Sequence, residues 1–397
     1  MNRAGGFSLV ELMIAILLGL LVAGAVISIF LGSRSSYSKT NGTSALTDDG
    51  RFSTDFINRA LRSTGFIGCT GAGSVISTGP NPAQSVLFDF PNALSGYEAV
   101  GTNPTQTFTL SSNPAGDSTV ADWTQGGGVS LPNNFTVLMP DGTTQATGLQ
   151  GLAVKFSDIL VVHGTLQTPA GQQTPPTNVT TFNTGSVVVN DATGFQVGGL
   201  AVVSDCAKAE VFQITSITGT TISFAANSTM SMGNTSGTLI PGFDSGELFI
   251  PTTSIYFVGV GSDGDGALMR GDLAAKNDNS GTYYLQLNEI VPDVENMQIL
   301  YGIDPTGSES ATSYVTADQA ALQCPNFPTT GAASFNCVRS LQIGFVVASP
   351  LQTVKRPAAA QVLTVLGTTI NAPGPPNLDT RQRTVYQVTV ALRNTLP

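Results

Sequence analysis

Hydrophobic residues gather at the start of the chain, in a run from Phe7 to Leu31 that contains one charged side chain, Glu11. About 20 apolar residues are enough for a helix to cross the hydrocarbon core of a bilayer, so this run is long enough to span one. A carboxylate inside such a segment is costly unless it is paired. Glu11 is therefore a candidate functional residue, and the question is which cation it meets.

After Leu31 the chain turns polar, but a helical period resumes. At 100° per residue one broad side carries the apolar residues Ala45, Leu46, Phe52, Phe56, Ile57, Ala60 and Leu61. Gly42 and Gly50 each weaken a helix by about 1 kcal/mol relative to Ala, and Gly65 suits its C-terminal end. We expect one long helix over 7–65, bent near Gly42, whose second part (32–65) packs its apolar side on a sheet.

Beyond this helix the pattern is that of short strands separated by turn-forming residues, which predicts a β-rich globular part over 66–397. Residues 70–150 read as a loop-rich insertion, and about 180–240 as a small β insertion. Clearer strands are predicted at 157–164, 186–190, 200–204, 210–217, 221–224, 254–260, 282–287, 294–302, 338–348 and 384–392. Alternation in the last strands suits an antiparallel sheet with one buried face. The expected fold class is α+β, with the long helix packed on this sheet.

The residues Gly6-Phe7-Ser8-Leu9-Val10-Glu11 resemble the type III signal of type IV prepilins and type II secretion pseudopilins. The resemblance implies a short leader (1–6), cleavage between Gly6 and Phe7 by the prepilin peptidase, methylation of the Phe7 amine, and an assembly role for Glu11, the fifth mature residue. An ordinary secretory signal cut after Ala23-Gly24-Ala25 and a plain membrane anchor are alternatives. Neither explains the spacing from glycine to glutamate.

Small residues recur at four-residue spacing in the apolar run, as Ala15, Gly19 and Ala23, and separately as Gly24 and Ser28. Such ridges let helix backbones approach closely in an apolar medium. They favour a helix that packs against copies of itself or its relatives, although a lipid-facing helix with incidental glycines remains the alternative.

Five fragments farther along the chain resemble PilW-type minor pilins: Ser157–Val161, Ser204–Cys206, Tyr301–Asp304, Val338–Leu341 and Ala391–Asn394. Together with the N-terminus they imply a pilin-like fold, whereas the insertions at 70–150 and 167–240 depart from the family pattern.

The chain has 397 residues, 11% of them charged, and a net charge of −10. This acidic balance argues against nucleic acid as a partner, because phosphate binding needs clusters of Lys and Arg. The four cysteines, Cys69, Cys206, Cys324 and Cys337, lie on the exported side and read as two disulfides with three possible pairings. The short loop favours Cys324–Cys337, which leaves Cys69–Cys206.

Catalytic and metal motifs are poorly supported. His163, the only histidine, lies in an apolar strand and reads as structural. Asp263 and Asp265, with Asp272 nearby, are a weak calcium candidate, because Asp-Gly pairs are also common turn formers. No nucleophile elbow, P-loop or dinucleotide motif is present. We expect no cofactor and no enzymatic activity.

The resemblance implies a minor pilin that helps to start or cap a type IV pilus. Its partners would be other minor and major pilins, the prepilin peptidase, the inner-membrane assembly platform and, as a further candidate, a large tip adhesin. Before assembly it would lie in the bacterial inner membrane, and afterwards in the pilus, at its tip. The alternatives are a minor pseudopilin of a type II secretion system and a pilin-anchored adhesin or binding domain.

Overall fold

The computed structural model places most of the chain. It describes residues 8–68, 70–71, 75–76, 86–110, 118–126, 129–165, 177–205, 207–226, 230, 233–239, 241–308, 310–324, 335–350, 361–373 and 381–393.

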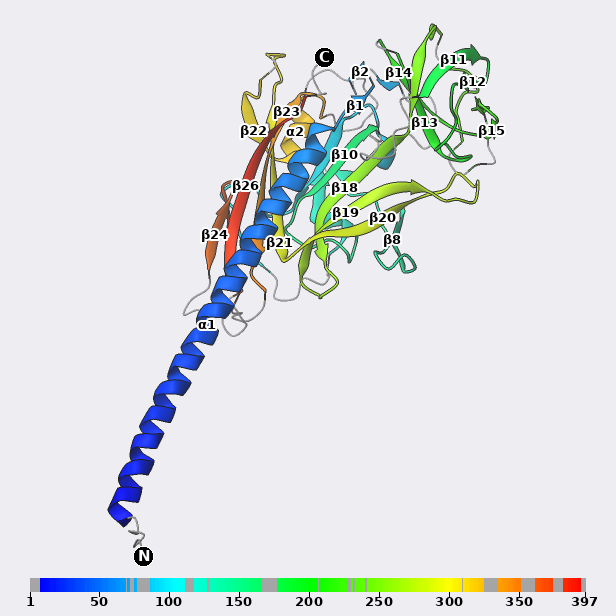
Figure 1. Ribbon diagram of the computed structural model, residues 1–397. Helices are drawn as coiled ribbons and strands as arrows, with labels where there is room; N and C mark the ends of the chain where they lie inside the picture. Colours follow the sequence, from blue (N-terminus) through cyan, green and yellow to red (C-terminus); the bar gives the residue numbers. More distant parts are fainter. Residues whose placement is uncertain are drawn as a thin grey trace, which may run out of the picture.

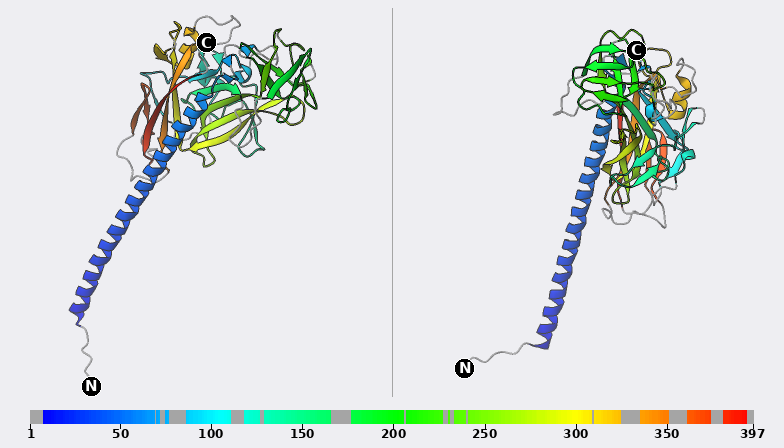
Figure 2. Two further views of the ribbon diagram at one scale, coloured as in Figure 1. Left: turned by 45° about the horizontal axis from the view of Figure 1, so that its top comes forward. Right: turned by 90° about the vertical axis from the view of Figure 1, so that its right-hand side faces the viewer.

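A single helix, α1 (Leu9–Arg62), dominates the shape of the molecule. At 1.5 Å per residue its 54 residues span roughly 80 Å. The N-terminal half projects away from the rest, and the second half lies across the β-rich body (Figures 1 and 2). The helix continues without interruption through Gly42 and Gly50, and Gly65 follows its end with a positive φ of 75°.

Strands and one further α-helix, α2 (Ala317–Gln323), build the body. The strands that begin before residue 150 are β1 (Phe66–Ile67), β2 (Thr70–Gly71), β3 (Val75–Ile76), β4 (Leu94–Ala99), β5 (Thr107–Thr109), β6 (Trp123–Gln125), β7 (Val129–Ser130), β8 (Thr136–Leu138) and β9 (Gln145–Thr147). Those up to residue 249 are β10 (Ile159–Thr165), β11 (Thr177–Asn183), β12 (Ser186–Val189), β13 (Leu200–Ser204), β14 (Ala209–Gln213), β15 (Ser216–Thr218), β16 (Thr221–Ser223) and β17 (Gly246–Phe249). The last are β18 (Pro251–Val260), β19 (Gly266–Ala275), β20 (Tyr283–Pro292), β21 (Val294–Ile303), β22 (Ser313–Val315), β23 (Val338–Ala348), β24 (Val362–Val365), β25 (Thr368–Asn371) and β26 (Arg383–Ala391). Short 3-10 turns lie at Val86–Phe88 and Val120–Asp122.

The sheet beneath α1 has four antiparallel strands in the order β22-β21-β23-β26. Leu46, Ile57 and Leu61 of α1 are buried in one hydrophobic cluster with residues of this sheet, such as Ile343 and Phe345. The opposite face is covered by the three-stranded sheet β24-β25-β5, whose residues share a second cluster with Val346. Both faces of β23 are therefore buried, and the expectation of one buried face was wrong for this strand.

A nine-stranded sheet, β7-β6-β4-β10-β18-β19-β20-β8-β9, packs beside the four-stranded one. Asp158 joins the two, because its carboxylate accepts hydrogen bonds from the backbone N–H of Ala99 at 2.9 Å and of Ile299 at 2.8 Å. Burial raises the pKa of Asp158 to about 7. The short strands β4 and β6–β9, within residues 70–150, thus belong to a sheet shared with later strands.

An eight-stranded sheet, β15-β16-β12-β11-β17-β13-β14-β3, forms a separate lobe at the end of the body remote from the N-terminus (Figure 1). It has its own core, which includes Val187, Phe212 and Ile222. Within residues 177–249 the first and last strands, β11 and β17, pair with each other, with Thr177 opposite Leu248, and β3 from earlier in the chain pairs with β14. The chain thus enters and leaves this part of the lobe through two adjacent strands, and β13 and β14 pack against the body, where Leu200, Val202 and Val211 share a cluster with Ile67 and Phe90.

The α+β class, with a long helix on antiparallel sheets, is confirmed. Two details differ from the sequence reading. Phe52, placed on the buried side of the helix, is 50% exposed. Strands β24 and β25 lie in a Pro-rich stretch that the sequence pattern marked as an excursion between strands.

Candidate assembly interface

The N-terminal half of α1 presents an apolar surface that nothing in the described structure covers. Every large hydrophobic side chain from Leu9 to Leu31 is more than half exposed, up to 74% at Leu9. The helix is long and apolar enough to span a membrane, and the length from Leu9 to Leu31, roughly 35 Å, is close to a bilayer's hydrocarbon thickness. An exposed apolar surface of this size needs lipid or other helices around it.

Glu11 lies in the first turn of this exposed half. Its carboxylate accepts a hydrogen bond from the backbone N–H of Ser8, with the nitrogen 3.4 Å from Oε2. A carboxylate at a helix N-terminus is favourable, because it meets unpaired N–H groups and the positive end of the helix dipole. Among the residues described, Glu11 meets no cation, so its charge is available to a partner from another molecule.

The small residues of this half also lack neighbours in the folded chain. A Cβ built on Gly19 or Gly24 would have no other heavy atom within 4 Å. Ala15, Ala23 and Ser28 are exposed, and the Ser28 hydroxyl donates within the helix to the carbonyl of Ala25 at 2.8 Å. These positions could accept a closely packed helix, and their packing role stays a prediction.

The second half of α1 lies against the four-stranded sheet. Gly42, Leu46, Gly50, Ser53, Ile57 and Leu61 are its buried residues. α1 approaches β26 so closely at Gly50 that a Cβ at this position would overlap the ring of Tyr386, so a glycine is needed there. The helix is thus fixed to the sheet at one half and free at the other.

Two family models match the chain at its two ends. Residues 1–27 match the prokaryotic N-terminal methylation motif, and residues 255–394 match PilW, the type IV pilus-assembly protein W. The chain matches a PilW-type prepilin-like protein. The comparisons with curated proteins and with solved structures each gave no match. The two ends of the chain are thus similar to pilin-type proteins, and the motif together with the apolar half of α1 favours a membrane anchor.

The PilW-type region, residues 255–394, contains the whole sheet beneath α1. Three fragments that carried the resemblance meet at one end of this sheet. Arg339 lies 3.7 Å from the carboxylate of Asp304, and the N–H of Leu392 donates to the Arg339 carbonyl at 2.9 Å. The fragment at Asp158 reaches the same sheet through Ile299.

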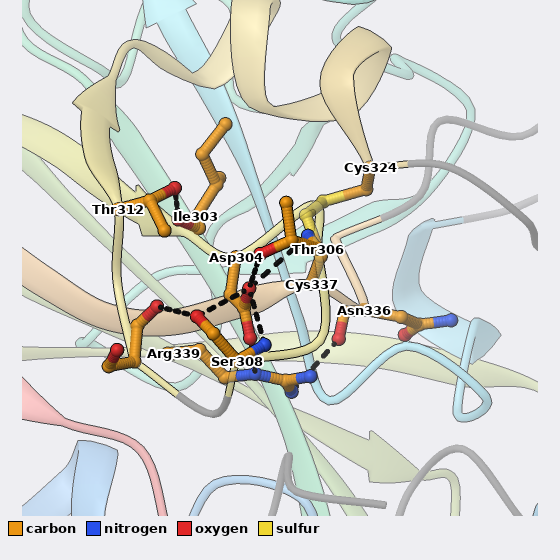
Figure 3. A network of polar contacts seen from close by, with 10 residues as sticks. Ile303, Asp304, Thr306, Ser308, Thr312, Cys324, Asn336, Cys337 and Arg339 are labelled. Carbon is orange, nitrogen blue, oxygen red and sulfur yellow. Dashed lines mark hydrogen bonds and ion pairs between the residues drawn. A yellow bond between two sulfur atoms is a disulfide. The ribbon is translucent and has the colours of Figure 1, made fainter.

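Asp304 organises the turn after β21 (Figure 3). Its Oδ1 accepts hydrogen bonds from the backbone N–H and hydroxyl groups of both Thr306 and Ser308, at 3.0 to 3.2 Å. Its own N–H donates to the carbonyl of Cys337 at 2.8 Å. This polar group is buried and fully used in holding the start of β23, so it is structural.

The disulfide Cys324–Cys337, beside this turn, is confirmed and ties the end of α2 to the start of β23 (Figure 3). Cys69 and Cys206 lie outside the described residues, as do Gly6 and Phe7. The neighbours of the second pair are in contact, because the Ser204 hydroxyl donates to the Ile67 carbonyl at 2.9 Å. The Cys69–Cys206 pairing stays a prediction that this proximity supports.

Asp263 and Asp265 lie together with Asp293, which the sequence reading missed; their carboxylate oxygens are within 4.8 Å of one another. Burial and the charge of Asp263 raise the pKa of Asp293 to about 6. Arg381 supplies positive charge here, with Nη1 3.2 Å from Asp265. Asp272 lies elsewhere and pairs with Arg270 on β19. The cluster stays the weak calcium candidate that the sequence offered.

His163 is 2% exposed on β10, with Nδ1 3.0 Å from the Thr253 hydroxyl and its ring against Phe90. Burial lowers its pKa to about 3, so it is neutral at ordinary pH. This placement agrees with the structural role expected for the histidine.

Proposed function

We propose that this chain is a minor pilin that takes part in starting or capping a type IV pilus. The observation that carries the proposal is the division of α1: its second half is buried on the PilW-type sheet, and its first half is apolar and exposed. A membrane-held subunit of this shape can pass from lipid into a bundle of like helices without exposing its apolar surface to water. The anchor would lie in the bacterial inner membrane before assembly.

Glu11 would direct this transfer. In the family that the N-terminus resembles, the glutamate meets the Phe7 amine of the neighbouring subunit. In this chain its only contact among the described residues is the local one with Ser8. Exchanging a single N–H for a full positive charge strengthens the interaction, because hydrogen bonds between ionised groups are about twice as strong as neutral ones. The partners would be other minor and major pilins, after processing by the prepilin peptidase.

A direct test is Glu11→Gln in the full chain, expressed in cells that make the pili. We expect a cleaved, membrane-inserted protein whose amount in sheared filaments falls by at least about tenfold, since breaking a buried charge pair costs more than about 2 kcal/mol. Asp48→Asn, an exposed carboxylate on the same helix, is the matched control and should assemble normally. Wild-type assembly of the Glu11→Gln protein would refute the role of this glutamate.

The mass of the purified chain tests the processing step on which this proposal rests. We expect a mature protein that begins at Phe7 with a methylated amine. A start at Val26, after the alternative signal-peptide site, would contradict the prepilin assignment.

The eight-stranded lobe favours a second role on the same subunit, as a binding module carried outward from the membrane. It lies at the end of the body remote from the N-terminus (Figure 1) and has its own core. Because Thr177 and Leu248 are strand partners, a short Gly-Ser linker can join them in place of residues 178–247, and the sheet beneath α1 should stay intact because its core contains no residue of the lobe. Normal filaments that no longer attach to surfaces would support this role, and unchanged attachment would exclude it.

A further inference from the structure

Among the described residues, nothing pairs with the outer edge of β26 along most of its length. This strand is the last of its sheet and pairs with β23 on one side only. Sheet edges of this length template pairing with other chains, and proteins usually shorten, charge or cover them. The sequence from Val385 to Ala391 contains no charge and no proline.

The register shows which backbone groups face outward. The N–H of Leu392 donates to Arg339, and the N–H of Ser349 donates to Gln382, so even-numbered residues of β26 bond inward and odd-numbered ones point away. The first outward N–H, that of Arg383, is satisfied by the side chain of Gln361 at 3.1 Å. The next outward groups, at positions 385, 387, 389 and 391, have no hydrogen-bond partner in the described chain, and the last three positions are exposed.

The opposite side of the same sheet is closed. Its edge strand β22 has three residues. Next to it, β21 is capped by a neighbouring segment, because the Met297 carbonyl accepts from the N–H of Asp158 and the Met297 N–H donates to the Ser157 hydroxyl. In the part of the chain that the structure describes, β26 is therefore the edge at which this sheet can be extended substantially.

The direction of β26 limits what can pair with it. Ala391, its last residue, pairs with Ser340, close to the disulfide at α2, which lies near the C-terminal end of α1 (Figure 1). The strand thus runs in the same direction as α1. Tyr386 touches α1 at Gly50, so a strand added to this edge would bring its own subunit beside the helix.

We propose that the β26 edge, residues 385–391, binds an edge strand of a companion pilin-type subunit in antiparallel orientation. The proposal rests on the function proposed above, because it assumes that subunits assemble with parallel helices. If the sheets of neighbouring subunits pair edge to edge, this chain can accept a neighbour at β26 but not at β22. Such a one-sided subunit suits the first or last position in the series.

A second copy of this chain does not fit the same edge. Two β26 strands paired antiparallel are related by a two-fold axis that reverses α1, so the two apolar halves would point to opposite ends and could not share one membrane. With parallel helices, β26 would face β22 of the copy, which offers three residues. A companion with a longer edge strand satisfies both the direction and the length.

The test places a photo-crosslinking amino acid at Gln387 of the full chain in cells that make pili, with Thr220, an exposed residue of the remote lobe, as the control position. We expect an adduct with a second pilin-type protein from position 387 and none from 220. Thr389→Pro should lower the adduct by about tenfold, which corresponds to about 1.4 kcal/mol, because the outward N–H is removed without loss of an internal hydrogen bond. Thr389→Val keeps that N–H and should retain the adduct.

Thr389→Lys is a second variant that leaves the backbone unchanged and should also lower the adduct, because charge on an edge opposes pairing. An adduct between two copies of this chain, or one that survives both Thr389→Pro and Thr389→Lys, would overturn the proposal. The amount of the chain in sheared filaments is measured in parallel. Absence from filaments would count against the proposed function, and presence there without an adduct at position 387 would count against the β26 contact alone.

Discussion

The two halves of α1 share one continuous helical backbone but differ in composition and in exposure. The half from Leu9 to Leu31 is almost entirely apolar and is exposed, whereas the half from Gly42 to Leu61 is far more polar and is partly buried. Glycine shows the difference most clearly. Gly50 is in contact with Tyr386, but Gly19 and Gly24 have open space around them. The comparison shows that a face of α1 is buried where another element of the chain fits against it, and that hydrophobicity alone does not decide burial.

The largest difference in stability between the two halves is expected when a glycine is replaced in each. Gly50→Leu should lower the free energy of unfolding by about 3 kcal/mol, because the added side chain enters space held by Tyr386. Gly19→Leu, the matched control, should leave it unchanged or raise it by up to about 1 kcal/mol through helix propensity. Thermal unfolding in detergent measures both. Equal losses in the two variants would mean that the halves do not differ in packing.

The sheet beneath the packed half depends on the disulfide at its far end. Changing Cys324 and Cys337 together to Ala should lower the free energy of unfolding by roughly 3 kcal/mol, the value for a closed loop of this length in the chain-entropy model. A reducing agent should lower the stability of the unmodified protein further, because it also opens the predicted Cys69–Cys206 disulfide. An unchanged midpoint of unfolding in both experiments would show that the hydrogen bonds of Asp304 stabilise the turn beside the disulfide without its help.

Carboxylates at the packed half of α1 should make the stability of the protein depend on pH. Burial, then the charge of Asp48, raises the pKa of Asp49 in the packed half, and Asp293, which faces Asp49, Asp263, Asp265 and Arg381, has a pKa of about 6. Since the folded state holds these protons more tightly than the unfolded state, the free energy of unfolding should fall as the pH rises from about 4 to about 6. The slope is about 1.4 kcal/mol per pH unit for each extra proton bound.

Asp293→Asn should flatten this slope and raise stability at pH 7. Denaturant titrations at pH 4.5, 5.5 and 6.5 would measure the slopes. A wild-type slope in Asp293→Asn would place the pH dependence elsewhere, for instance at Asp158.

The smallest effect is expected at Phe52, which is 50% exposed. Phe52→Ser should change the free energy of unfolding by no more than about 0.5 kcal/mol, as for other surface positions. Phe56→Ser should cost more, because Phe56 packs edge-on against Tyr256 with ring centroids 6.2 Å apart. If Phe52→Ser were the costlier change, the boundary of the packed face would have been drawn wrongly.

The sequence predicted those elements whose signal is local. The helix follows from a continuous apolar run and a 3.6-residue period, and β13 and β23 were predicted at their observed bounds because each is a continuous or alternating apolar stretch. The Cys324–Cys337 pair followed from a short loop. Glu11 was marked by its charge in an apolar run.

The elements that were missed depend on contacts between distant parts of the chain. Strands β24 and β25 lie in a Pro-rich stretch, and β25 is paired by β5, more than 200 residues earlier. Phe52 is apolar and fits the helical period of the buried side, but it is 50% exposed. The helix packs with Gly50 against Tyr386, and a glycine in the sequence does not reveal such a contact. Asp293 was missed because it is distant from Asp263 in the sequence, and only the fold brings their carboxylate oxygens within 4.8 Å of each other.

The entry and exit of the chain through two paired strands of the eight-stranded lobe have a mechanical consequence. A pull on the N-terminal end of α1 is passed to β26 and β23 through the side chains that meet around Gly50 and Ile57. Thr177 and Leu248 lie side by side, so a pull between α1 and the sheet beneath it does not run along the chain of the lobe. A load carried between the helices of a filament can therefore strain α1 and its sheet while the lobe stays folded, whereas a load applied through a ligand bound to the lobe would pass through β11 and β17.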